Sequence, residues 1–309
     1  MSLASRAASL PIATRFAGLF GALTPNARGM LWICISGIIF SVLNAATRGI
    51  ALTLGPFETQ FLRYLGTIIV MAPFIAQVGL AAYSPNGLAG QAWRGVIHTT
   101  GLLLWFSALP MIPLADMTAI GFTTPIFVMI GAVLVFHEKM IWARWVSALV
   151  GLVGVVIVLA PKMSGGGGIY NLMMLASSPL FACSFLITKA LTKRDRPEVI
   201  VVWQAISIAV FTLPFALWQW HWPTLGQCLW MLGCGVLGTL GQYCMTRGIR
   251  VAEVSATQPV TFLNLIWATA IGYVVFAEVP GISTIIGGSV IFAATTWIAR
   301  REARARPRH

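Results

Sequence analysis

The chain has 309 residues, of which 58% are apolar and only 9% are charged. An average soluble domain carries about 25% charged residues, so this chain has too few charges to cover a water-facing surface. The net charge of +12 could suggest nucleic-acid binding, but the basic residues lie in short segments beside apolar runs, and no soluble domain carries a binding face. The composition excludes a soluble globular protein and predicts an all-α integral membrane protein.

Ten apolar runs follow one another along the chain, and each is close to the roughly 20 residues that a helix needs to cross a bilayer. They lie at 29–47, 57–78, 93–111, 114–136, 141–160, 169–189, 198–219, 225–246, 254–276 and 281–299. The stretch 93–136 is too long for one crossing, and we divide it at the proline-bearing turn SALPMIPLAD. Ten crossings place both ends of the chain on the same side of the membrane.

Basic residues are unevenly distributed between the two sides that these crossings define. With the N-terminus inside, 17 of the 20 Lys and Arg residues fall on the cytoplasmic side, Arg94 and Arg144 among them. Cytoplasmic loops of membrane proteins carry an excess of positive charge, so we expect a multi-pass protein of the bacterial inner membrane with both termini in the cytoplasm. Residues 1–27 are expected to be a cytoplasmic lead-in rather than a signal peptide, and 301–309 a basic cytoplasmic tail.

A four-residue word, V-F-x-E, ends two of the apolar runs, at 135–138 and again at 275–278. Five crossings separate the copies, and because five is odd, the second copy has the opposite orientation in the membrane. Ile126 pairs with Ile266 at the same offset of 140, as Ala132 does with Gly272.

Inverted repeats are a recurrent transporter design, with the substrate site near the membrane midplane where the repeats meet. We therefore expect ten transmembrane helices arranged as two inverted five-helix repeats, at 28–161 and 169–300. The glycine-rich segment 162–168 is expected to be a flexible periplasmic linker between them.

Polar side chains at membrane depth are candidates for the substrate site because lipid cannot satisfy them, and mid-span aromatic side chains could stack against an apolar or aromatic substrate. The candidate substrate-binding residues are Phe40, Asn44, His98, Trp105, Thr123, Ser178, Phe181, Gln242, Tyr243, Gln258, Asn264 and Trp267. Ser and Thr can instead bond back to their own helix, and His98 can be a proton carrier or a packing residue. Gly235, Gly238 and Gly241 recur every third residue and predict close helix packing.

Arg63 and Asp116 fall at similar depth near the outer ends of their runs, and we expect them to form an ion pair that braces or gates the bundle. Glu138 and Glu278 end their runs and are expected to be structural. Because no other mid-span charge is evident, we expect Gln242 or Gln258 to hold the charged end of a substrate.

Rival functions find little support. The spans lack a nucleophile with a base and lack a metal-ligand set, and the five cysteines match no metal motif, so we expect no enzymatic activity, no metal and no cofactor. The repeat predicts two-fold pseudo-symmetry, whereas a channel favours a ring of like residues. A secondary transporter is the best reading.

Five segments occur along the chain in the order PFETQFLRYL, PLADMTAIGFTTPIFVMIGAVLVFHE, RWVSALVGLVGVVIVLAP, GVLGTLGQ and LIWATAIGYVVFAEVP. Together they resemble the drug/metabolite transporter superfamily, specifically its EamA-type ten-helix exporters, and within it the YddG-like aromatic amino-acid exporters. The resemblance implies export of small metabolites by alternating access, and we expect aromatic or other apolar amino acids as the cargo.

The alternative is a broad exporter of apolar amines or drugs, or of another small metabolite of the same superfamily. Export of cations usually needs a buried acid, which the spans lack. Expected partners are a small-molecule substrate and the lipid bilayer, with protons as a candidate coupling ion and no nucleic acid. The sequence leaves the oligomeric state open and is compatible with a monomer.

Overall fold

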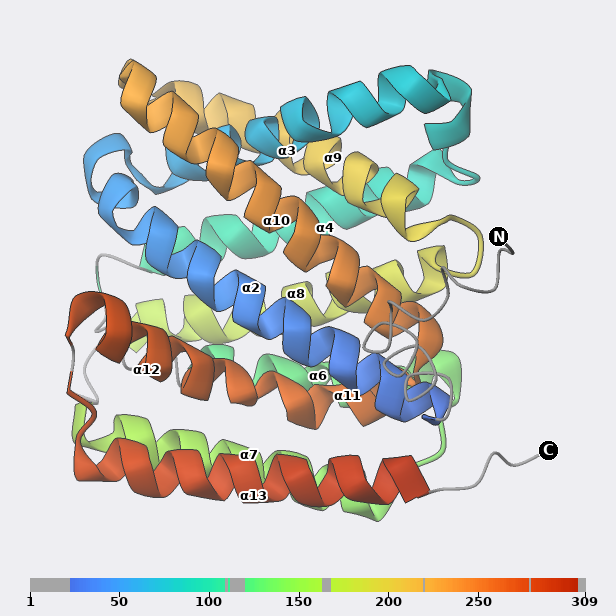
Figure 1. Ribbon diagram of the computed structural model, residues 1–309, viewed down its shortest axis with the longest axis vertical. Helices are drawn as coiled ribbons and strands as arrows, with labels where there is room; N and C mark the ends of the chain where they lie inside the picture. Colours follow the sequence, from blue (N-terminus) through green and yellow to red (C-terminus); the bar gives the residue numbers. More distant parts are fainter. Residues whose placement is uncertain are drawn as a thin grey trace, which may run out of the picture.

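The computed structural model of the protein describes residues 23–108, 111, 120–162, 168–218, 220–277 and 279–304. The elements within these residues are helices that lie side by side in a bundle (Figure 1). Eight helical stretches of the described chain, with Val254–Val275 counted as one, are long and apolar enough to cross a membrane. The all-α integral membrane protein predicted from composition is confirmed.

The helices fall into two halves of the chain. The first half contains α2 (Pro25–Leu54), α3 (Pro56–Val78), α4 (Leu88–Ala108), α6 (Thr124–Phe136) and α7 (Trp142–Leu159), with short 3-10 turns at Leu80–Tyr83 and Ala160–Lys162. The second half contains α8 (Gly168–Leu191), α9 (Pro197–Trp218), α10 (Leu225–Val251), α11 (Val254–Thr261), α12 (Leu263–Phe276) and α13 (Ile282–Arg304). Helix α4 has 21 residues, enough for about 30 Å, but its polar residues make it less apolar than the eight.

Two helix starts follow from local sequence. Thr24 precedes α2, and its hydroxyl accepts a hydrogen bond from the N–H of Ala27 at 3.2 Å, while Pro25 occupies the first helical position. This satisfies an N–H that has no partner within the helix, and proline loses nothing at that position. Helix α10 begins with a capping box in which Thr224 and Gln227 bond reciprocally.

Equivalent helices of the two halves run in opposite directions. Arg144 near the start of α7 bonds to Glu302 near the end of α13, and these two helices lie side by side along one edge of the bundle (Figure 1). Glu58 near the start of α3 accepts a hydrogen bond from the backbone of His221, just after the end of α9. The two halves are therefore inverted relative to each other, as the repeated word predicts.

The V-F-x-E word ends its helix in the same way in both halves. Its third residue is left-handed each time, with φ of +53° at His137 and +54° at Ala277. Each of these residues donates its N–H to the carbonyl five positions back, at Ala132 and Gly272. A left-handed residue of this kind is a common helix stop, so the offset of 140 is a repeat of backbone structure as well as of sequence.

Helices of one half pack mainly on helices of the other: α2 on α10, α3 on both α9 and α10, α4 on α8 and α7 on α13. Glycine allows several of these close approaches. A Cβ on Gly235 of α10 would lie 2.5 Å from the carbonyl carbon of Gly66 on α3, and one on Gly241 would lie 3.2 Å from the ring of Phe40 on α2. The glycine row of α10 thus packs closely, as predicted.

The ninth apolar run, expected as one helix, is interrupted. Helix α11 ends at Thr261 and α12 begins at Leu263, with the fully buried Phe262 between them. Phe122, 140 positions earlier, lies in a turn just before α6, and the two rings stack with centroids 5.8 Å apart. The turn before α6 and the break between α11 and α12 therefore lie against each other inside the bundle.

Candidate functional site

A narrow cavity, with free space for about one water molecule, lies between α2, α3, α9 and α10, where the two halves meet. We call it the central cavity, and it is lined by Phe40, Arg63, Tyr64, Thr67, Val201, Gln204, Ala205, Gly238 and Gln242. Helices α3 and α9 are equivalent helices of the two halves, so the cavity has the position expected of a substrate site in an inverted-repeat transporter.

Hydrogen-bond donors dominate the polar part of the wall. Arg63 donates from Nη2 to the hydroxyl oxygen of Tyr64 at 3.0 Å, and its guanidinium carbon lies 4.8 Å from the centre of that ring. Gln204 accepts a hydrogen bond at Oε1 from Nη2 of Arg94, which stands behind it on α4. Nε2 of Gln242 is buried and has no partner among the described residues. The wall is suited to a ligand that brings acceptor atoms.

Arg94 corrects two sequence-based expectations, because it is neither a loop residue nor solvated. It is the seventh residue of α4, which begins five residues earlier than the apolar run 93–111, and only 2% of its surface is exposed. Its Nε and Nη1 have no hydrogen-bond partner in the described part of the chain. The expectation that no charge besides Arg63 lies inside the bundle was therefore wrong.

His98 follows Arg94 by one helical turn, on the same side of α4. Its Nδ1 lies 3.2 Å from the hydroxyl of Ser184 on α8, and its ring centre lies 5.3 Å from that of Phe181. Phe181, Trp105 and the cavity residue Tyr64 pack in one apolar cluster. Two predicted residues, Phe40 and Gln242, thus lie in the cavity wall. Trp105 and Phe181 belong to the same apolar cluster as the wall residue Tyr64, and His98 contacts Phe181.

Trp267 and Asn264 lie on α12 and pack elsewhere. Trp267 borders a cluster different from that of Trp105, and its indole nitrogen is buried without a partner among the described residues. A Cβ on Gly37 of α2 would lie 2.2 Å from Oδ1 of Asn264, so this amide sits tightly against α2. Trp105 and Trp267 therefore belong to different apolar clusters.

Three polar candidates bond to nearby backbone. The hydroxyl of Thr123 donates to the carbonyl of Ile120 at 2.6 Å, and Ser178 donates to the same carbonyl from α8 at 3.4 Å. Gln258 donates to the carbonyl of Val254, one turn earlier in its own helix, at 3.3 Å. The bonds of Thr123 and Gln258 stay within four residues, as the sequence left open for Ser and Thr, whereas Ser178 bonds to the backbone of a different element.

The remaining predictions concern Asn44, Tyr243, the expected pair of Arg63 and Asp116, and Glu278. Asn44 is exposed on the surface of the bundle. The ring of Tyr243 lies 5.5 Å from the guanidinium of Arg247. Arg63 is half-buried, and its expected partner Asp116 lies outside the described residues, so their pairing stays a prediction. Glu278 also lies outside the described residues.

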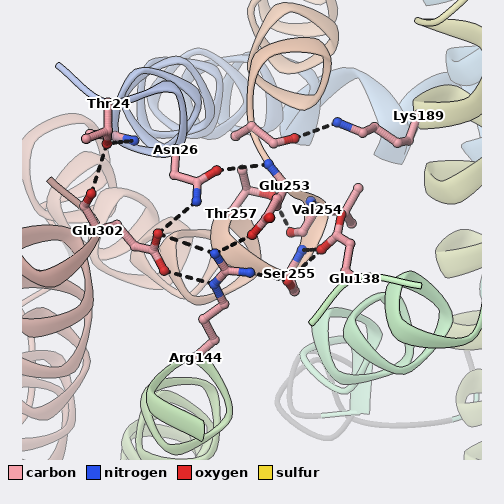
Figure 2. A network of polar contacts seen from close by, with 12 residues as sticks. Thr24, Asn26, Glu138, Arg144, Lys189, Glu253, Val254, Ser255, Thr257 and Glu302 are labelled. Carbon is pink, nitrogen blue, oxygen red and sulfur yellow. Dashed lines mark hydrogen bonds and ion pairs between the residues drawn. The ribbon is translucent and has the colours of Figure 1, made fainter. Parts of the chain in front are cut away.

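A second polar cluster joins the halves at one end of the bundle (Figure 2). Arg144, 1% exposed, donates from Nε to Glu302 at 2.8 Å and from Nη1 to the hydroxyl of Ser255 at 2.8 Å, and its Nη2 pairs with Glu253. The sequence places Arg144 on the cytoplasmic side. The structure adds that this side chain is buried, because packing of α7 against α13 turns it toward acids of the second half.

The same cluster satisfies helix ends. Glu138 accepts hydrogen bonds from the N–H groups of Val254 and Ser255, at 2.7 and 2.9 Å, at the start of α11, where the helix dipole favours negative charge. Lys189 donates to the carbonyls of Ile249 and Ala252 at the end of α10. We call this cluster of polar side chains the polar clasp. Its members are Glu138, Arg144, Lys189, Glu253, Ser255 and Glu302.

Comparison with known proteins identifies relatives along nearly the whole chain. The model of the EamA-like transporter family matches twice, at 27–160 and at 168–300. A riboflavin transporter of Rhizobium johnstonii is 30% identical over 89% of this chain and 92% of its own. An S-adenosylmethionine uptake transporter of Rickettsia prowazekii is 26% identical over 92% of this chain and 96% of its own.

A pseudopaline exporter of Pseudomonas aeruginosa is 26% identical over 88% of this chain and 96% of its own. One solved crystal structure superposes with a TM-score of 0.76, covering 90% of this chain and 99% of its own at 17% identity. That likeness supports the fold alone.

Proposed function

Because the chain belongs to the EamA-like transporter family, we propose that its central cavity binds a ring-bearing small metabolite and that the two repeats move it by alternating access. The protein is a multi-pass transporter of small metabolites and not an enzyme. We further propose that the protein lies in the inner membrane with both termini in the cytoplasm.

The observation that carries the proposal is the position of the central cavity between α3 and α9. Arg63 on α3 and Gln204 on α9 are equivalent at an offset of 141, and both line the cavity. When two inverted repeats exchange conformations, a site on their shared interface opens first to one side and then to the other. A cavity at this interface needs no separate path for entry and exit.

The aromatic cluster of Trp105, Phe181 and Tyr64 supports a cargo with a flat ring, because stacking adds to the gain from burying the ring. An aromatic amino acid brings a ring for this cluster and a carboxylate for the donor groups of the wall, and the narrow cavity has to widen during alternating access to admit it. We propose amino-acid export as one reading. The second is transport of a larger ring-bearing metabolite, which the names of two relatives favour, a riboflavin transporter and an S-adenosylmethionine uptake transporter.

The test is transport into proteoliposomes that hold the purified full chain. Labelled phenylalanine, S-adenosylmethionine and riboflavin are offered separately, with and without a pH gradient, and threonine serves as the ring-free comparison. Replacing Trp105 by Ala should lower transport of the ring-bearing cargo by about tenfold, the upper range of one stacking contact, and leave threonine little changed. Trp297→Ala, on the exposed side of α13, is the matched control.

Two results would count against the proposal. If none of the offered compounds is carried but an apolar amine is, the broad amine exporter takes its place. If Trp105→Ala and Trp297→Ala behave alike while a ring-bearing cargo is carried, the aromatic cluster is packing and the cargo binds elsewhere.

A further inference from the structure

We infer that Arg94 and Gln204, together with Gln242, form an anion subsite in the central cavity that takes a carboxylate of the cargo. The inference rests on the proposed function, since it assigns a chemical group of the cargo to one end of the cavity. Its starting point is a buried guanidinium that the protein itself leaves largely unsatisfied.

The charge on Arg94 has no acid to balance it in the part of the chain that the structure describes. No described carboxylate lies within 4.0 Å of Arg94 or of Arg63. The acid nearest in sequence on α3, Glu58, sits at the start of that helix and accepts a hydrogen bond from the backbone of His221. An unpaired charge at membrane depth is costly, and such residues commonly mark substrate paths.

Several donors of the Arg94 guanidinium are left for a ligand. Arg94 uses one hydrogen of Nη2 on Gln204, so Nε, Nη1 and the second hydrogen of Nη2 remain, and Nη2 with either neighbour can form a fork. Because Arg94 holds the carbonyl of Gln204, the amide NH2 of Gln204 is the group left for a ligand, and Gln242 adds a buried Nε2 without a described partner. A guanidinium fork matches the two oxygens of a carboxylate. Arg63 adds a second positive charge on the same wall.

Comparison of the two repeats indicates that the fold does not require the charge of Arg94. At the offset of 140 that aligns α4 with α10, Arg94 corresponds to Cys234 and His98 to Gly238. The same offset aligns Gly101 with Gly241, and each of these glycines meets a phenylalanine ring of the helix packed on it. Helix α10 is built and packed equivalently without the charge. The arginine is thus an addition of the first repeat that packing does not require.

A thermal-unfolding experiment on the purified full chain in detergent tests the subsite without knowledge of the natural cargo. The probes are phenylacetate, its neutral analogue phenylacetamide, and inorganic phosphate. Phenylacetate should raise the unfolding temperature of the wild type and phenylacetamide should not. Arg94→Gln should weaken phenylacetate binding by about tenfold or more, the factor of one lost charge-assisted hydrogen bond. Arg250→Gln removes an exposed charge from α10 and should bind as the wild type does.

Arg94→Gln should also unfold at the same or a higher temperature than the wild type when no ligand is present, because it removes a buried charge without a partner. Arg94→Lys keeps the charge but loses the fork, and it should bind phenylacetate with intermediate strength. This variant keeps the test informative if Arg94→Gln does not fold.

Three results would overturn the subsite. They are equal protection by phenylacetate and phenylacetamide, protection by phosphate alone, and unchanged phenylacetate binding in Arg94→Gln and Arg94→Lys. A failure to carry any ring-bearing cargo into vesicles would instead count against the proposed function, because protection by phenylacetate is measured without transport.

Discussion

Replacing Gly235 by Ala adds one methyl group, which should force α3 and α10 apart. A Cβ there would lie 2.5 Å from the carbonyl carbon of Gly66 and 2.8 Å from the backbone nitrogen of Thr67, where ordinary contacts begin near 3.4 Å. The opposing atoms are backbone, so no side chain can rotate out of the way. The two helices must therefore move apart by about 1 Å, which is overpacking of a dense interior.

The magnitude follows from the cost of overpacking, about 1–3 kcal/mol. For a chain of this size that corresponds to a fall of roughly 2–10 °C in unfolding temperature for Gly235→Ala. Gly233, two residues earlier in the same helix, has no atom within 4 Å of a built Cβ. Ala is a better helix former than Gly by about 1 kcal/mol, so Gly233→Ala should unfold at the same temperature or higher.

The assay is tryptophan fluorescence of the two purified variants and the wild type on heating in one detergent. Cargo binding provides a second readout, because α3 carries Arg63 and α10 carries Gln242 on the cavity wall, and their separation should weaken binding in Gly235→Ala alone. Equal unfolding temperatures for Gly235→Ala and Gly233→Ala would refute the close approach of these helices.

Two further outcomes are expected. Arg144→Gln should lower stability by about 3–5 kcal/mol, because it leaves buried Glu302 without its cation, whereas Arg250→Gln should change it little; similar unfolding temperatures would show that the polar clasp does not hold the halves together. For topology, a cysteine at Trp222, which is 88% exposed, should react with an impermeant thiol reagent outside intact cells, in a background with the native cysteines replaced. A cysteine at Arg194 should not, and the reverse labelling would overturn the proposed orientation.

A small part of the cavity lining was open to prediction, but the buried charge of Arg94 was not. Phe40 and Gln242 were predicted as site residues and line the central cavity, because aromatic and amide groups at mid-span stand out against an apolar background. Gln204 and Arg94 were missed. The spacing of Arg94 and His98, one turn apart before the apolar stretch GLLLWF, was the available signal that α4 starts earlier and turns both residues to the same side.

The sequence by itself determined the number and inversion of the repeats. The hydrophobic runs are set by the thickness of a bilayer, and the recurrence of V-F-x-E after an odd number of crossings admits only one relative orientation. Run length depends on neighbouring residues and orientation on a count of crossings, so both follow from the sequence without knowledge of tertiary contacts. The structure adds that the third residue of the word is left-handed in both halves.

Only the tertiary structure decided which charges are buried and what they meet. Arg94 and Arg144 look alike in sequence, as basic residues beside apolar runs, yet Arg144 meets Glu253 and Glu302 while Arg94 meets the amide of Gln204. Which face of a helix is covered depends on the direction and distance of its partner helix. That partner comes from the other half of the chain, 110 residues away for Arg94 and 158 for Arg144 and Glu302, and no local pattern encodes it.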